Sequence, residues 1–175
     1  MISGGERRMG ETDVEIERKF LVKGAFPEPC KTVKEVSFYL PSGRGEEIRV
    51  QNREGACIIE VKRKSSRLSR ERTRAEISIE TFRTLFELSG GEKMAIRRKL
   101  HYFPGKSPTI TVREYSGKLK GLVRAEVNFR SETEAKRFRK PAWMGPEITS
   151  GALGRNKTLY SMTKGAFLKE LESFN

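Results

Sequence analysis

Cysteine, histidine and tryptophan are scarce in this chain of 175 residues. It has two cysteines, one histidine and one tryptophan. Two cysteines cannot build a disulfide framework, and a single histidine nearly excludes a zinc site made of cysteine and histidine. A Ser-His or Cys-His catalytic pair would have to use His101, the single histidine, as its base. These absences are typical of a reduced protein, and they predict a cytoplasmic location.

Long apolar segments are also missing. No apolar run approaches the ~20 residues of a transmembrane helix, and no apolar region of the kind found in secretory signals follows the first methionine. Residues 1–12 are mostly glycine and polar residues, so we expect a disordered leader there and one folded domain over residues 13–175. We therefore expect no membrane partner, and the chain is predicted to be a monomer or a homodimer.

Acidic residues are outnumbered by basic ones. Asp and Glu total 23 against 36 for Lys and Arg, which gives a formal net charge of +13 at pH 7. Such an excess indicates an anionic partner, and by itself it fits a nucleic acid, a membrane surface or a small phosphate ester equally. A solvated basic surface without a specific partner is the simpler interpretation.

From residue 14 onward the chain alternates apolar and polar residues with the period of two that is typical of strands. Strands are predicted over 14–22, 34–40, 46–51, 56–63, 72–79, 94–103, 108–115 and 122–130. Their connections are too short for repeated crossover helices, so we expect an antiparallel arrangement. Helices are predicted over 81–88, over 132–139 after a capping box of Ser131 and Glu134, and over 156–174 with Asn156 as the N-cap.

Nearly every predicted strand has one apolar face and one charged face. Cations gather on the charged faces, namely Lys19, Arg49, Lys62, Arg72, Arg74, Arg97, Lys99, Arg113, Arg124 and Arg130. One interpretation is an ordinary sheet with its charged face in water. The other is a closed barrel with the charged faces inside and helices over its apolar outside. Because like charges near a protein surface repel by ~4 kcal/mol, such a barrel needs a multivalent anion.

Residues 15–22, which read EIERKFLV, resemble the ExExK signature that opens the CYTH family, also called triphosphate tunnel metalloenzymes. Further matches follow in the family's order over residues 14 to about 160, among them PAWMGPEIT at 141–149. The resemblance implies an α+β, mainly β fold, which is a closed eight-stranded antiparallel β-barrel with flanking helices. It also implies that the charged tunnel binds a triphosphate group, in most members together with Mg²⁺ or Mn²⁺.

The resemblance further implies roles for residues of this chain. The catalytic residues are predicted to be Glu15, Glu17 and Lys19. Substrate phosphates are predicted to bind to Lys19, Arg49, Lys62, Arg72, Arg74, Arg97, Lys99, Arg113 and Arg124. One Mg²⁺ or Mn²⁺ ion is predicted to bind to Glu15, Glu17, Glu126 and Asn128. The residue types suit this chemistry, because a triphosphate has about four negative charges that arginine and lysine can neutralise, and hard cations prefer carboxylate oxygens.

Several acidic positions of the family pattern have other residues here. Arg74 stands in place of a glutamate, Thr111 and Arg113 stand in place of E-x-D, and Asn128 replaces the second glutamate of E-x-E. The cations of the pattern are largely kept while metal ligands are lost. Arg74 and Arg113 are therefore candidates to supply the charge of a missing metal ion.

One register stays open at this stage. The family's K-x-R pair is assigned to Arg97 and Lys99, and a shift by one residue would place Arg98 and Leu100 at these positions instead. Only one of the two alternatives puts Arg97 and Lys99 on the charged inner face.

Three functions remain open on the sequence alone. The favoured one is a triphosphatase-like hydrolase that cleaves a phosphoanhydride bond of a small triphosphate or polyphosphate. The second is a degenerate relative that binds polyphosphate, a nucleotide or another polyanion without turnover. The third is nucleic-acid binding by the basic segments 62–74 and 136–140. Because few aromatic residues interleave with these cations, base stacking is not indicated, and solvated loops explain them more simply.

Overall fold

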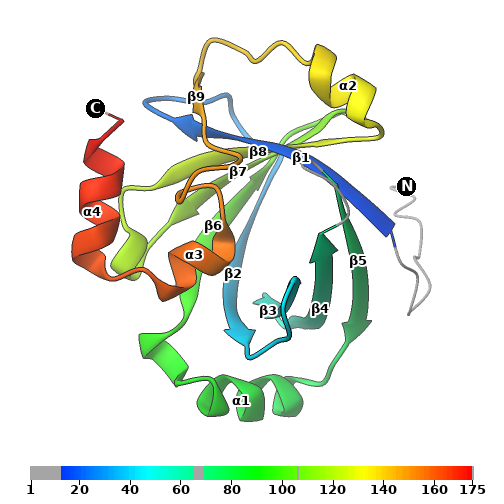
Figure 1. The fold of residues 1–175 in the computed structure, drawn as a ribbon, viewed down its shortest axis with the longest axis vertical. Helices are drawn as coiled ribbons and strands as arrows, with labels where there is room; N and C mark the ends of the chain where they lie inside the picture. Colours follow the sequence, from blue (N-terminus) through cyan, green and yellow to red (C-terminus); the bar gives the residue numbers. More distant parts are fainter. Residues whose placement is uncertain (1–12, 65–68, 106, 175) are drawn as a thin grey trace.

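A computed structural model describes residues 13–64, 69–105 and 107–174 of the chain. Eight antiparallel strands close a barrel, and β1 pairs with both β5 and β8 to complete the circle. Around the barrel the strands are β1 (Asp13–Val22), β5 (Ser69–Glu76), β4 (Ala56–Lys64), β3 (Glu46–Arg53), β2 (Lys31–Leu40), β6 (Ile96–Tyr102), β7 (Thr109–Tyr115) and β8 (Val123–Phe129) (Figure 1). The predicted closed eight-stranded barrel is confirmed. The expected leader at residues 1–12 lies outside the described residues.

Strand β1 is the seam of the barrel. Its first residues pair with β5, with Ile16 opposite Ser69, and its other edge pairs with β8. Beyond β5, the edge of β1 is taken up by a ninth strand, β9 (Met144–Glu147), which sequence analysis did not predict. Neither edge of β1 is therefore left without a partner strand, which matters because an open strand edge invites pairing with other chains.

The helices are α1 (Ile79–Leu88), α2 (Glu132–Arg137), α3 (Asn156–Ser161) and α4 (Lys164–Glu172), with short 3₁₀ turns η1 (Gly91–Lys93) and η2 (Gly117–Leu119). The Ser131 half of the predicted capping box of α2 is confirmed, since Ser131 Oγ accepts a hydrogen bond from Glu134 N at 3.1 Å. The Glu134 carboxylate accepts from Arg130 N at 2.8 Å, one residue before the N-cap. The single helix predicted over 156–174 is two helices, because Thr163 caps a new helix, α4. The predicted Asn156 cap is wrong, since α3 follows Arg155 and has no side-chain cap.

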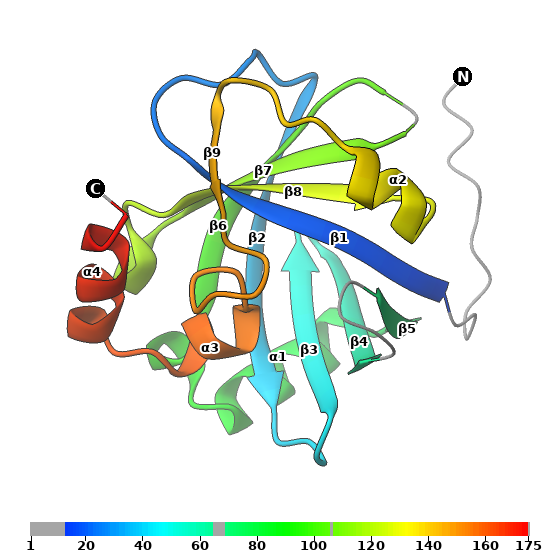
Figure 2. The ribbon, with the colours of Figure 1, turned by 45° about the horizontal axis from the view of Figure 1, so that its top comes forward.

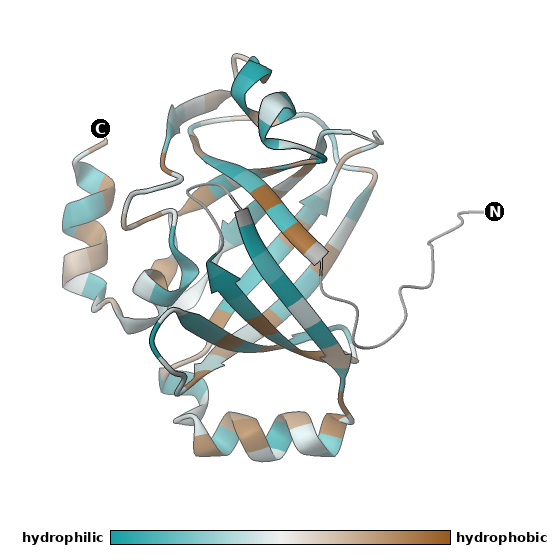
Figure 3. Cartoon of the chain, turned by 45° about the vertical axis from the view of Figure 1, so that its right-hand side comes forward, coloured by the Kyte–Doolittle hydropathy of each residue, from teal (hydrophilic) through white to brown (hydrophobic). Residues whose placement is uncertain are grey.

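The apolar faces of the strands point outward and are covered, as the barrel interpretation requires. Helix α1 covers β2, β3 and β4, where Phe82 packs with Phe38, Val50 and Cys57. A second apolar cluster lies on the outer face of β1, β7 and β8, beneath α2 and β9 (Figure 2). Hydropathy alternates along several of the strands, whereas β5, which reads SRERTRAE, is hydrophilic over most of its length (Figure 3).

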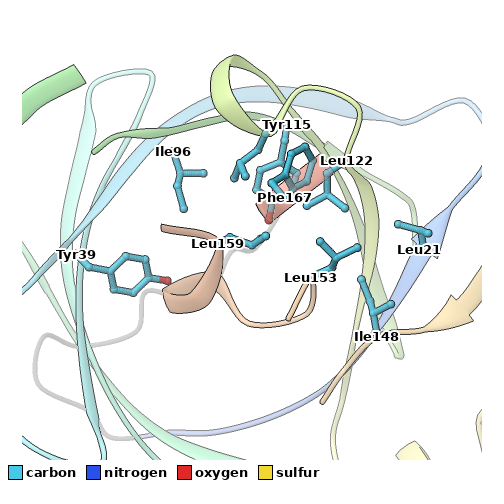
Figure 4. Close-up of a cluster of buried hydrophobic side chains, with 10 residues drawn as sticks. Leu21, Tyr39, Ile96, Tyr115, Leu122, Ile148, Leu153, Leu159 and Phe167 are labelled. Atoms are coloured by element: carbon cyan, nitrogen blue, oxygen red, sulfur yellow. The ribbon is translucent and has the colours of Figure 1, made fainter. Parts of the chain in front are cut away.

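A third apolar cluster closes one end of the barrel. Leu159 of α3 and Leu153 of the preceding loop lie within the ring of strands, near Tyr39 of β2 and Ile96 of β6 (Figure 4). Leu153 and Leu159 are fully buried. This cluster fixes α3 beside the charged interior, which begins directly below it. Among the described residues, no helix combines the length and apolarity that crossing a membrane requires.

Candidate functional site

Four buried carboxylates, each shared by two cations, occupy the barrel interior. These ion triplets are Glu15 with Lys62 and Arg72, Glu35 with Arg53 and Arg98, Glu60 with Arg49 and Arg74, and Glu126 with Arg113 and Arg124. Each triplet has one positive charge in excess, so the interior is cationic although its acids are ionised. Alternation along the strands produces this arrangement, because every second side chain of a strand faces inward.

The Glu60 triplet follows directly from the strand register. Arg49 of β3 lies opposite Glu60 of β4, which in turn lies opposite Arg74 of β5. Arg49 Nη2 donates to Glu60 Oε1 at 2.7 Å, and Arg74 Nε donates to Glu60 Oε2 at 2.8 Å. Burial alone would raise the pKa of Glu60, but the attraction of Arg49, Lys62 and Arg74 outweighs it and holds that pKa well below its ordinary value.

The Glu126 triplet joins β7 and β8 to the segment that closes the barrel. Arg113 and Arg124 lie opposite each other in register, and each binds one oxygen of Glu126. The fully buried Arg124 also donates to Leu153 O at 2.8 Å and to Asn156 Oδ1 at 2.5 Å. Burial raises the pKa of Glu126, and Arg113 and Arg124 outweigh that effect, so the pKa lies well below its ordinary value.

The two remaining triplets lie on other sides of the interior. Arg72 Nη1 donates to Glu15 Oε1 at 2.8 Å, and Lys62 Nζ binds the other oxygen of Glu15. Burial raises the pKa of Glu15, yet these two cations bring it below its ordinary value. Arg98 Nε and Arg53 Nε donate to the two oxygens of Glu35 at 2.7 and 2.6 Å.

Several buried donors in this interior have no hydrogen-bond partner within the described part of the chain. They are Arg49 Nε, Arg113 Nε and Nη1, and Arg124 Nε, and the Ser37 hydroxyl and the Gln51 amide are unpartnered as well. Most buried polar groups in proteins are satisfied, so a cluster of unsatisfied ones calls for an explanation. Guanidinium N–H groups that are already buried and lack an acceptor suit a ligand with many acceptor oxygens.

A narrow cavity with room for about one water molecule leads into this interior. Its lining is mostly charged and comprises Glu17, Lys19, Tyr39, Glu47, Arg49, Glu60, Lys62, Arg70, Arg155 and Asn156. Sequence reasoning did not assign Arg70, Arg155 or Asn156 to this site. Arg70 lies on the same strand face as Arg72 and Arg74, so the alternation of the strand could have predicted it. Asn156 reaches the site only through the packing of α3.

The structure corrects the prediction for β6. Arg97 and Lys99 lie on the outer face, where they pair with Glu92 and, at 3.8 Å, with Glu114. Arg98 lies inside instead, because β6 pairs with β2 in the register that sets Arg98 opposite Glu35. The alternative with a shift by one residue is therefore the right one.

The other predicted cations are inside the barrel. Lys19, Arg49, Lys62, Arg72, Arg74, Arg113 and Arg124 all take part in the interior ion pairs. His101 lies on the same outer face of β6 as Arg97, between Thr32 and Glu114. It does not face the interior, so a catalytic role as a base there is excluded by its position.

The four predicted metal ligands do not assemble a metal site. Both oxygens of Glu15 and of Glu126 are held by cations, and Glu17 is paired with Lys19 at 2.5 Å. Asn128 lies opposite Glu17 in register and adds one neutral oxygen. Across residues 13–64, 69–105 and 107–174, no three acidic, histidine or cysteine side chains come together as a cluster that could hold a metal ion. The donors present therefore do not fit Mg²⁺ or Mn²⁺.

Two curated relatives resemble this chain over most of their length, although no family model matches it. An inorganic triphosphatase from Acetivibrio thermocellus is 30% identical over 146 residues, which span 83% of this chain and 92% of the relative. An inorganic triphosphatase from Nitrosomonas europaea is 31% identical over 150 residues, which span 83% of this chain and 95% of the relative.

Solved structures share the barrel. The crystal structure of the inorganic triphosphatase NE1496 matches with a TM-score of 0.61 and 27% identity, over 85% of this chain and 96% of that one. The PH1012 protein from Pyrococcus horikoshii, at 18% identity and a TM-score of 0.54 over 70% of this chain and 84% of that one, shares the fold alone. The chain is at least 30% identical to two relatives over more than 90% of their length, and it shares its barrel with a solved triphosphatase structure. It therefore belongs to the CYTH, or triphosphate tunnel, family.

Proposed function

We propose that this protein hydrolyses inorganic triphosphate inside its barrel. The observation that supports this most is the set of buried, unpartnered guanidinium N–H groups in an interior where two cations share each carboxylate. The relatives that span most of the chain are named inorganic triphosphatases, which supports triphosphate as the anion. The substrate is therefore a small molecule.

Binding would rest on the interior cations. The unpartnered N–H groups of Arg49, Arg113 and Arg124 would donate to phosphate oxygens, and Lys19 and Lys62 line the cavity as further cations. Hydrogen bonds between arginine and phosphate are charge-assisted and often bidentate, so they fix the orientation of the anion as well as its charge.

Hydrolysis would need a water molecule next to the terminal phosphorus. Glu17 lines the cavity and, among the described residues, is ion-paired with Lys19 alone, so we assign it to orient that water and to take its proton. The bond to the bridging oxygen breaks, and inorganic phosphate and pyrophosphate leave. The arginines would stabilise the negative charge that spreads over the transferred phosphoryl oxygens. Glu15 would act indirectly, because it positions Lys62 and Arg72.

No step is assigned to Mg²⁺ or Mn²⁺, the ion that the family resemblance implies, because its predicted ligands are engaged with cations. An ion that enters on the phosphate oxygens of the substrate is compatible with this geometry. The setting we propose is a reduced cytoplasm, in which Cys30 and Cys57 are free thiols. We propose that the active form is a monomer or a homodimer.

Nucleic-acid binding by segment 62–74 loses support in this arrangement. Lys62, Arg72 and Arg74 point into the barrel and are bound to Glu15 and Glu60. They are therefore not part of an outer basic stripe. Residues 65–68 of this segment lie outside the described residues.

Phosphate release from inorganic triphosphate, ATP and thiamine triphosphate tests the proposal. We expect release to be fastest with inorganic triphosphate. In Lys19→Met the loss of one charge-assisted contact of about 1.5–3 kcal/mol should lower kcat/KM by roughly 10- to 150-fold.

Lys99→Met is the matched control, because Lys99 is a lysine of the outer barrel face, and its kcat/KM should stay within about twofold of wild type. If the wild type releases no phosphate from inorganic triphosphate with or without Mn²⁺, the hydrolase proposal fails and the binding-only alternative takes its place.

A further inference from the structure

We infer that this barrel binds triphosphate without a divalent cation, with arginine side chains in the place of the ion. All four carboxylates of the interior ion triplets are bound by arginine on at least one oxygen. The inference rests on the proposed function for the identity of the anion. It concerns how the negative charge of that anion is neutralised.

The replacement of a metal ion by arginine side chains is clearest at Glu126. Arg113 Nη2 binds one oxygen of this carboxylate and Arg124 Nη2 binds the other at 2.5 Å. Glu126 is 1% exposed, so a metal ion could reach it only by pushing a guanidinium away. A guanidinium displaced from a buried ion pair is left without its counter-charge, which is unfavourable. The two arginines therefore disfavour metal binding to Glu126.

Arg113 is bound to Glu126 and has further N–H groups that can donate hydrogen bonds. Its Nη2 is bound to the carboxylate, whereas its Nε and Nη1 are buried and have no partner among the described residues. One edge of the guanidinium is thus fixed by the protein, and the remaining N–H groups suit an acceptor that the protein does not provide. A phosphate oxygen is such an acceptor.

The remaining acids of the interior are also engaged with cations. Both oxygens of Glu60 and of Glu15 are bound by cations. Among the described residues, Glu17 and Glu47 are the acids of the cavity lining that are paired with one cation each, and Asn128 is the register neighbour of Glu17. Mg²⁺ requires a near-octahedral set of oxygens and usually takes one or two carboxylates from the protein, and here Glu17 lies 2.5 Å from the Lys19 ammonium and Glu47 lies 3.0 Å from Arg70 Nη1.

Arginine can perform the electrostatic task of the ion. In phosphoryl transfer a metal neutralises charge that develops on phosphate oxygens, and a positioned arginine does the same. Each interior triplet has one cation in excess of its carboxylate, and the low dielectric of a buried site strengthens its attraction for an anion. The interior therefore attracts triphosphate before any metal is added.

Calorimetric titration of the full chain with sodium triphosphate tests this, first in EDTA and then in excess Mg²⁺ or Mn²⁺. We expect the Kd in EDTA to be no more than about threefold weaker than the Kd with either ion. A Kd that rises more than about tenfold in EDTA, or binding that is seen only with an ion, would overturn the inference.

Arg113→Met tests the contribution of Arg113 to metal-free triphosphate binding. It keeps a side chain of similar length but loses the guanidinium, so the Kd in EDTA should rise at least about tenfold. Arg97→Met is the matched control on the outer face, where Arg97 pairs with Glu92, and it should leave the Kd unchanged. An unchanged Kd in Arg113→Met contradicts the inference. Should this variant fail to fold, Arg113→Lys keeps the charge and is expected to weaken metal-free binding, because the ammonium cannot contact Glu126 and phosphate along two edges.

A failure of this inference can be distinguished from a failure of the proposed function. Tight binding in EDTA without phosphate release would contradict the hydrolase proposal and leave this inference intact. Phosphate release and binding that both require an ion would do the reverse.

Discussion

At the scale of residues, shared ion pairs explain how so many charges are buried in one barrel. A buried carboxylate without a cationic partner destabilises a protein, and so does the removal of one partner from a buried ion pair. Glu35 is bound by Arg98 and Arg53 on its two oxygens and is 1% exposed. Burial raises its pKa, while Arg98, Arg53 and Arg49 lower it more strongly, to about 2.

This pKa predicts an acid-sensitive contribution to stability. Its folded value lies below the ordinary 4.5, so the ionised carboxylate stabilises the fold fully above pH 4.5, and that stability is lost as the pH falls from there through 2. With about 1.4 kcal/mol for each pKa unit, the loss is roughly 3 kcal/mol. Glu35→Gln should lower the free energy of unfolding at pH 7 and flatten its decrease between pH 4.5 and 2.

Urea unfolding measured from pH 7 to pH 2.5 checks this prediction. Glu28→Gln, which changes an exposed glutamate, should keep the pH dependence of the wild type. The same steep decrease in Glu35→Gln as in the wild type would show that Glu35 does not titrate as described.

The error in β6 shows where residue patterns stop being decisive. Residues 96–102, IRRKLHY, have cations on both faces, with Arg97 and Lys99 on one and Arg98 on the other. Alternation alone cannot choose between these faces. The choice is made by Glu35, which lies 63 residues away and receives Arg98 in register.

At the scale of elements, the sequence predicted most strands and missed those features that depend on tertiary packing. The apolar pattern of 156–174 suits one helix, but α3 turns into the end of the barrel with Leu159, and α4 starts again at the Thr163 cap and buries Phe167. Strand β9 has four residues, two of them proline and glycine. It exists because the edge of β1 beyond β5 is free to pair with it.

The end cluster should contribute strongly to stability through α3. Leu159 is fully buried, so Leu159→Ala is expected to cost about 2–5 kcal/mol in the free energy of unfolding. Leu88→Ala is the matched control, because Leu88 is a helical leucine that is 78% exposed, and it should change stability by less than about 0.5 kcal/mol.

Chemical denaturation of both variants measures the difference. Equal losses in the two variants would mean that α3 does not close the barrel as described. Because α3 also holds Asn156 against Arg124, Leu159→Ala should weaken triphosphate binding as well.

At the scale of the whole molecule, the barrel is apolar outside and ionic inside. The outer apolar faces are covered by α1, α2 and β9, and the net charge of +13 is concentrated in part in the interior. Strand alternation alone left an ordinary sheet open as an alternative, and the CYTH resemblance pointed to the closed form. What the sequence could not supply is the pairing of each acid with two cations, which depends on the register of strands far apart in the chain.

A crystal structure with a triphosphate analogue that resists hydrolysis tests the central claim most directly. We predict phosphate oxygens within about 3.2 Å of the unpartnered N–H groups of Arg49 and Arg113 in the barrel interior. An analogue bound only on the outer surface, for example along the basic segment 136–140, with all four interior triplets unchanged, would contradict the claim.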